Sequence, residues 1–132
     1  MKPRTRQPLP ARSIAVVAAY AVLSVAGLLG TWYFNLTYSG TDGTYVEAWF
    51  ANPASSSAAV DVIVTALVAC IFYGVEGRRL GWRLRWLLFI PLTFVIALAF
   101  ALPLFLMLRE LQLAQGAPHE RTTGQSPMGQ AA

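Results

Sequence analysis

The chain has 132 residues, of which 56% are hydrophobic and only 12% are charged, and its net charge is +4. A mean hydropathy of +0.52 excludes a soluble globular domain, and the apolar content excludes disorder over most of the length. The single cysteine, Cys70, excludes an intramolecular disulfide, a four-cysteine zinc site and a CxxC redox pair. We therefore expect an integral membrane protein.

Three apolar runs are long enough to cross a bilayer, which takes about 20 helical residues. They cover residues 13–34, 58–77 and 86–108. The prediction is an all-α transmembrane domain over 13–113, with three transmembrane helices in a small bundle. A basic segment, 1–12, precedes it.

The first run has a second interpretation, a cleaved signal peptide. Four basic residues, an apolar core at 14–23 and small residues at 24–26 match the three parts of such a peptide. The chain stays apolar after Ala26, which favours an uncleaved span.

Polar segments separate and follow the runs. Residues 35–57 are rich in Gly, Ser, Thr and Asn, which predicts an exposed loop with a short interfacial helix around 45–51. Asn52 and Pro53 are suited to be the N-cap and the first residue of a helix. The tail, 114–132, is rich in Gly, Pro, Gln and Thr and is predicted to be disordered.

The basic residues predict an orientation, because positive charge beside a span is retained in the cytoplasm. Eight of the ten lie before the first run or between the second and third. We therefore predict that the N-terminus and an arginine-rich hairpin lie inside, and that the 35–57 loop and the C-terminus lie outside. The hairpin arginines are Arg78, Arg79, Arg83 and Arg85.

The second run carries the candidate functional side chains, because ionisable groups inside a membrane are costly. Asp61, Thr65 and Glu76 share one helix face. Structural ion pairing within an antiparallel hairpin is the leading interpretation, and a proton or ion relay is the alternative. The two carboxylates lie roughly 20 Å apart along a helix, too far for a paired acid and base. The predicted pairs are Asp61 with Arg109, and Glu76 with Arg83 or Arg85.

Small residues form a ladder on the opposite face of the second run and another on the first run. Such ladders let helices approach closely in lipid. We expect the two runs to pack through them, within one chain or between copies. The ladders comprise Ala66, Cys70 and Gly74 on the second run, and Ala15, Ala19, Ala26 and Gly30 on the first.

Two prolines interrupt the third run. Pro91 lies close to its start, whereas Pro103 lies deeper and removes the donor for the Ala99 carbonyl. We expect a bend near the outer leaflet, and a neighbouring helix, a hydroxyl side chain or water must satisfy the freed carbonyl.

The sequence contains no constellation that indicates catalysis or a cofactor. His119 has no second histidine or cysteine nearby with which to bind a metal, and no nucleophile triad or phosphate loop is present. The arginines beside the spans account for the net charge without nucleic-acid binding, and they suit anionic lipid headgroups. We expect no enzyme activity, no cofactor and no nucleic-acid partner.

Several short segments together carry a resemblance to a known family. They are Asn52-Pro53-Ala54, Asp61, the Glu-Gly-Arg-Arg-Leu-Gly stretch at 76–81, the Pro-Leu-Phe-Leu stretch at 103–106, and Arg109-Glu110. The sequence resembles the bacterial domain of unknown function 2834 family of small membrane proteins. That resemblance implies a three-span, multi-pass protein of the bacterial inner membrane, with no assigned activity.

The hypothesis for function is a non-catalytic structural or accessory membrane subunit that acts through helix association. Its partner is the lipid bilayer together with further copies or a larger membrane complex. The alternative is an oligomeric small-solute or ion transporter or channel component that uses Asp61, Thr65 and Glu76. A pathway needs polar groups at mid-membrane, and the sequence between Thr65 and Glu76 offers only Cys70 and Tyr73.

Overall fold

The structure, a computed structural model, describes residues 10–41 and 43–116. Within these residues the fold is helical and has no strand, as predicted. Three of the helices, α1, α3 and α5, are long and apolar enough to cross a membrane. The elements are α1 (Ala11–Thr37), α2 (Tyr45–Trp49), α3 (Pro53–Arg79), the 3-10 helix η1 (Arg85–Leu88), α4 (Phe89–Val95) and α5 (Leu98–Gly116).

The predicted helix starts in the polar loop are confirmed. The Asn52 side chain accepts hydrogen bonds from the backbone N–H groups of Ala54 and Ser55, and Pro53 opens α3. Thr44 and Glu47 form a capping box at the start of α2, which matches the predicted interfacial helix. The predicted disordered tail, 114–132, begins too early, since α5 continues to Gly116. Residues 117–132 of that tail and residues 1–9 of the basic segment lie outside the described residues.

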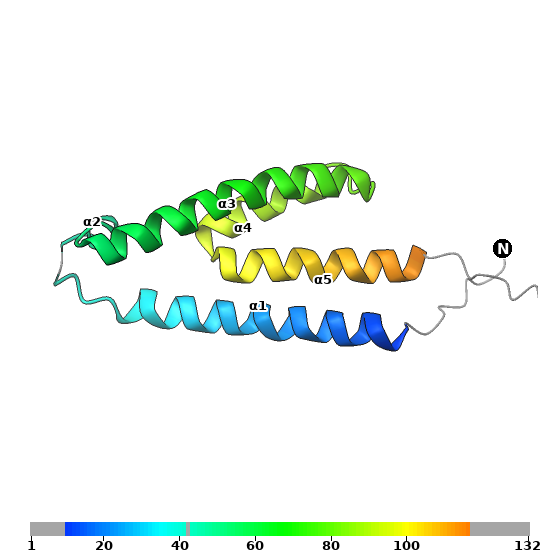
Figure 1. The fold of residues 1–132 in the computed structure, drawn as a ribbon, viewed down its shortest axis with the longest axis horizontal. Coiled ribbons are helices and arrows are strands. Elements are labelled where there is room, and N and C mark those ends of the chain that lie inside the picture. Colours follow the sequence, from blue (N-terminus) through cyan, green and yellow to red (C-terminus); the bar gives the residue numbers. More distant parts are fainter. Residues whose placement is uncertain (1–9, 42, 117–132) are drawn as a thin grey trace, which may run out of the picture.

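The third apolar run is not one helix, which corrects the predicted span at 86–108. After η1 and α4 the helix ends at Val95, and the chain reverses direction so that α5 runs back antiparallel to α4 (Figure 1). The bend expected at Pro103 is instead a complete turn at Ile96 and Ala97. Hydropathy alone does not distinguish one crossing helix from two shorter apolar helices that fold back on each other.

The turn is stabilised by close packing against α1. Ala99 lies so near Gly27 that a Cβ at Gly27 would be 2.2 Å from the Ala99 carbonyl oxygen. The buried Ser24 hydroxyl donates to the Phe100 carbonyl at 3.1 Å. Pro103 cannot donate to the Ala99 carbonyl, and the Ser24 hydroxyl bonds to the next carbonyl along the chain, that of Phe100.

The helices pack in an order that differs from the prediction. α1 lies along α5, while α3 lies along η1 and α4, and the backbones of α1 and α3 do not approach each other (Figure 1). Packing of the first and second spans within the chain was therefore a wrong expectation. The reason is that the α4–α5 hairpin lies between them.

The two small-residue ladders differ in how far other residues of the chain cover them. On α3, Ala66 is buried, Cys70 is half-buried, and Gly74 lies against the Trp86 ring. On α1 the ladder is left uncovered, and a Cβ at Gly30 would meet nothing within 4 Å. The exposed members are Ala15, Ala19, Ala26 and Gly30.

An aromatic core joins α3, α4 and α5. Tyr73 and Phe105 are completely buried, with ring centroids 4.8 Å apart. Phe89 meets Phe105 edge-on at 5.0 Å, and Trp82 covers Phe105 from the turn after α3. This core lies in the half of the molecule that contains the α3–η1 turn.

Candidate functional site

A charged cluster lies beside the aromatic core. The Arg109 Nε donates to Glu76 Oε1 at 2.6 Å, and Arg79 Nη1 lies 3.4 Å from Glu76 Oε2. The Glu76 side chain is only 7% exposed, whereas that of Arg79 is 73% exposed. Arg109, at 29%, is therefore the cation that compensates the buried carboxylate, and Arg79 adds a weak surface contact.

Both predicted ion pairs were wrong in their partners. Arg109 pairs with Glu76 and not with Asp61, and Glu76 pairs with Arg109 and Arg79 in place of Arg83 or Arg85. The physical reason is the reversal at Ile96 and Ala97, which returns Arg109 to the end of the molecule from which the third run started.

The alternative set for a transport pathway is not brought together. Asp61 and Thr65 are exposed on α3, whereas Glu76 is buried against α5. The described residues of one chain therefore present no shared space lined by these three side chains. Between Thr65 and Glu76, Tyr73 carries a buried hydroxyl group. It lies 3.3 Å from the Thr93 hydroxyl within the core.

The turn after α3 holds the end of α5 in place. Gly81, at φ +71°, allows the Trp82 N–H to bond to the Gly77 carbonyl, which ends the helix as a Schellman motif. Gln112 on α5 donates to the Leu80 carbonyl at 2.7 Å and accepts from the Trp82 indole. Residues 109–112 thus lie beside the α3–η1 turn.

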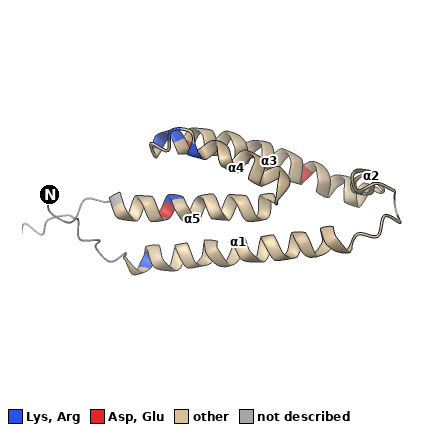
Figure 2. Ribbon diagram, turned by 180° about the vertical axis from the view of Figure 1, so that it is seen from behind, with Lys and Arg blue, Asp and Glu red and all other residues tan. Residues whose placement is uncertain are grey.

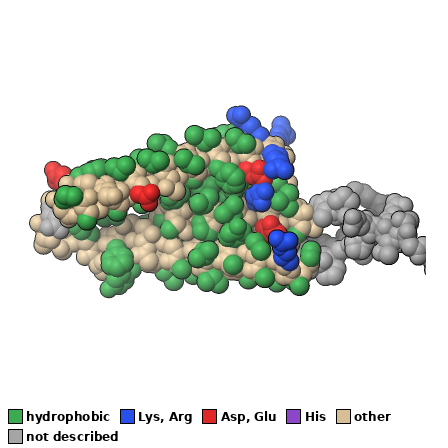
Figure 3. All heavy atoms as spheres, viewed as in Figure 1, with side chains coloured by type: hydrophobic (Ala, Val, Ile, Leu, Met, Phe, Trp, Pro, Cys, Tyr) green, Lys and Arg blue, Asp and Glu red, His purple; other side chains and the backbone are tan. Residues whose placement is uncertain are grey.

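Positive charge gathers at this end. Figure 2 shows the described arginines around the start of α1, the α3–η1 turn and the later part of α5, and Figure 3 shows them at one end of the surface. Arg78 lies over the Trp86 ring at 5.4 Å, and Arg83 adopts φ +48°. The end of α5 therefore lies at the same end of the molecule as the start of α1, which gives no support to the prediction that the N-terminus lies inside and the C-terminus outside. We call this region the arginine end, comprising Arg12, Arg78, Arg79, Arg83, Arg85 and Arg109.

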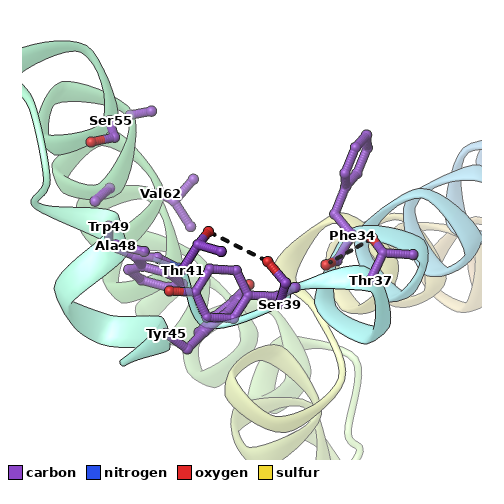
Figure 4. Close-up of a pocket in the computed structure, with 12 residues that line it drawn as sticks. Phe34, Thr37, Ser39, Thr41, Tyr45, Ala48, Trp49, Ser55 and Val62 are labelled. Carbon is purple, nitrogen blue, oxygen red and sulfur yellow. Dashed lines mark hydrogen bonds between the residues drawn. The ribbon is translucent and has the colours of Figure 1, made fainter. Parts of the chain in front are cut away.

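The opposite end contains a pocket of about 580 Å³ that the sequence did not indicate. Figure 4 shows Phe34 and Thr37 of α1 on one side, Trp49, Ser55 and Val62 of α2 and α3 on the other, and Tyr45 between them. We call this region the loop end. The polar segment 35–57 predicted an exposed loop with a short interfacial helix there, but a pocket depends on how far apart α1 and α3 stand.

Three aromatic side chains that contact one another in series line this pocket. Tyr38 meets Tyr45 edge-on at 5.5 Å, and Tyr45 meets Trp49 at 5.8 Å. The Tyr38 hydroxyl donates to the Gly43 carbonyl at 2.9 Å, and the Tyr45 hydroxyl bonds to Asn35. These contacts attach the loop and α2 to the end of α1.

Glu47 is the acidic group of this loop. Its carboxylate accepts from the backbone N–H of Thr44 at 2.8 Å and from the Thr44 hydroxyl at 2.8 Å. These two hydrogen bonds lower the pKa of Glu47 below its usual value. The described residues contain no group of three His, Cys, Asp or Glu side chains that could hold a metal ion.

Comparison with known families identifies a matching family model. The family model described as protein of unknown function DUF2834 covers residues 19–111, which is more than half of the chain. The chain belongs to this family. The match runs from α1 to the end of the charged cluster in α5, so it includes the hairpin and the Glu76–Arg109 pair. No curated protein matched the chain, and no solved structure matched it.

Proposed function

We propose that this DUF2834 protein is a non-catalytic accessory subunit of a bacterial inner membrane, which uses α1 to dock onto a helix of another membrane protein chain. The observation that carries the proposal is the uncovered small-residue face of α1. Its counterpart on α3 is occupied by the chain's own Trp86, whereas the α1 ladder has no partner among the described residues.

The charged groups support a structural role more than a pathway. Glu76 is compensated by Arg109, and the aromatic core fills the space between α3, α4 and α5. A buried carboxylate engaged by an arginine at 2.6 Å serves to fix the hairpin against α3. The transport alternative has no comparable support, because Asp61 and Thr65 face outward.

The proposed topology has two crossing helices and a hairpin that enters halfway. α5 as a whole is long enough to cross, but Arg109 and Glu110 lie within it. The uncharged part before them, Leu98–Leu108, measures roughly 16 Å, and η1 with α4 measures roughly 18 Å. A bilayer core is about 30 Å thick, so the turn at Ile96 and Ala97 lies near its middle. Such a turn is tolerated in a membrane when protein covers it, as Ser24 and Gly27 of α1 do here.

Charge supports this topology. No Lys or Arg occurs between Arg12 and Arg78, so all ten basic residues fall on one side if the chain crosses only twice. The positive-inside rule then assigns the arginine end to the cytoplasm without exception, whereas three crossings leave Arg109 and Arg121 on the opposite side.

The docking proposal is tested by extracting the tagged full chain from native membranes with a lipid-retaining polymer and measuring the mass of the particle. We expect a second copy or another membrane protein in the particle, and its loss in Ala19→Leu, because the added bulk prevents close helix approach. Val25→Leu is the matched control, since Val25 is 54% exposed on a different face of α1. A particle that contains one chain and lipid only contradicts the proposal.

A further inference from the structure

We propose that the pocket at the loop end binds an acyl chain of a zwitterionic phospholipid. The pocket lies between Phe34 of α1 and Val62 of α3, where these helices have no third helix between them. The hairpin ends at Ile96 and Ala97, level with Gly27, so it leaves the more distant part of α1 uncovered. In a membrane the part of this space beside Ala58, Ala59 and Val62 suits hydrocarbon, because its lining is apolar and offers water no side-chain partner.

The volume fits a lipid chain. The pocket has about 580 Å³, which lies within the roughly 300–1,000 Å³ of ligand sites. An unbranched chain enters such a space from the side without separating α1 from α3.

The lining changes from apolar to polar toward the loop, as an amphiphile requires. Ala58, Ala59 and Val62 line the α3 side, whereas Thr37, Ser39 and Thr41 place hydroxyl groups at the loop side. Tyr45 and Trp49 lie between these two regions, and such rings prefer the interface between headgroups and chains. The acyl chain therefore lies against α3, and its ester and headgroup lie beside the hydroxyls.

Charge selects the headgroup. No Lys or Arg occurs between Arg12 and Arg78, so the loop, α2 and the halves of α1 and α3 beside the pocket offer no cation to a phosphate that carries net negative charge. Among the described residues, the acidic groups on these parts are Glu47 on α2 and Asp61 on α3. A zwitterionic lipid presents an ammonium group to this side, whereas an anionic lipid adds repulsion.

The test uses the full chain reconstituted in phosphatidylcholine bilayers that contain a phosphatidylcholine with a photoreactive diazirine in its acyl chain. After illumination, peptide mass spectrometry maps the adducts. We expect labelling of residues 34–38, Tyr45 and Trp49 at least five-fold above that around Val25, which is exposed on a face of α1 away from the small-residue ladder. Labelling at the same level as Val25, or a cross-link to a second chain at this position in place of lipid, overturns the proposal.

Two variants and a second lipid sharpen the test. Val62→Trp fills the pocket and should reduce its labelling at least five-fold, whereas Val60→Trp on another face of α3 should leave it unchanged. Ala58→Leu is a smaller filling substitution that serves if Val62→Trp does not fold. A diazirine phosphatidylglycerol should label the pocket at least three-fold less than the phosphatidylcholine probe. Labelling that persists in both filled variants, or that is equal for the two lipids, contradicts the assignment.

Discussion

The arginine end and the loop end differ in construction although apolar helices form both. At the arginine end, Tyr73 and Phe105 are completely buried and Glu76 is held by Arg109. At the loop end, α1 and α3 diverge around a pocket, and Phe34 is 71% exposed. The difference follows from the length of the α4–α5 hairpin, which supplies a third layer to one half of the molecule only. Stability is therefore expected to concentrate at the arginine end.

The largest effect is expected from removing an aromatic ring at each end. Phe105→Ala should lower the free energy of unfolding by about 3–5 kcal/mol, because it opens a cavity among four neighbouring rings. Phe34→Ala removes the same ring from an exposed position and should change it by less than about 1 kcal/mol. Denaturant titration in detergent micelles measures both. Equal losses for the two variants would show that the ends do not differ in packing.

The next effect concerns the charged cluster. Arg109→Glu places two carboxylates together and should cost about 3 kcal/mol or more, since it leaves the buried Glu76 without its main cation. Combining it with Glu76→Arg should recover part of the loss in the same titration. Asp61→Asn at the exposed site on α3 is the control and should have little effect. A double variant as unstable as Arg109→Glu alone would argue against a direct pair.

A smaller effect distinguishes two glycines one turn apart on α1. Gly27→Ala forces a methyl group against the Ala99 backbone and should destabilise the protein by about 1–3 kcal/mol. Gly30→Ala meets no neighbour within 4 Å and should stabilise it by up to about 1 kcal/mol through helix propensity. Thermal unfolding of both variants checks the signs. A neutral Gly27→Ala would mean that the hairpin turn does not contact α1.

The smallest effect concerns pH at the loop end. Hydrogen bonds from Thr44 hold the pKa of Glu47 below its usual value, so its contribution to stability is complete above that usual value and is lost as the pH falls through the lowered pKa. Proteolysis of the 38–44 loop should therefore accelerate below about pH 4.5 in the wild-type protein. Glu47→Gln should make it faster at neutral pH and flatten this pH dependence. An unchanged pH profile in Glu47→Gln would assign the response to another group.

Sequence reasoning was reliable where the signal was local. Apolar runs identified α1 and α3, Asn52 with Pro53 marked the start of α3, and the short segments at 76–81 and 103–106 pointed to the correct family. The prediction failed at Ile96 and Ala97, where apolar residues surround the turn and neither Gly nor a polar residue marks it. That error gave Arg109 the wrong partner and placed the end of α5 at the wrong end of the molecule. The expected packing of the first two spans came instead from the small-residue ladders, and it failed because the hairpin lies between α1 and α3.

The charge distribution contained a signal that would have found the hairpin. Two crossings place all ten basic residues on one side, whereas three crossings place eight there. The pocket had no comparable signal, because its existence depends on the spacing of α1 and α3. Its hydroxyl and aromatic side chains are also typical of any loop at a membrane surface.

The half-length hairpin is tested most directly by the side of the membrane on which α5 ends. In a Cys70→Ser background, Gln115→Cys, Arg83→Cys and Ser39→Cys are treated with a membrane-impermeant maleimide in right-side-out and inverted vesicles. If the hairpin is half-length, Gln115→Cys and Arg83→Cys will react only in inverted vesicles, and Ser39→Cys will react only in right-side-out vesicles. Reaction of Gln115→Cys on the same side as Ser39→Cys would mean that the third run crosses the membrane, and would rule out the half-length hairpin.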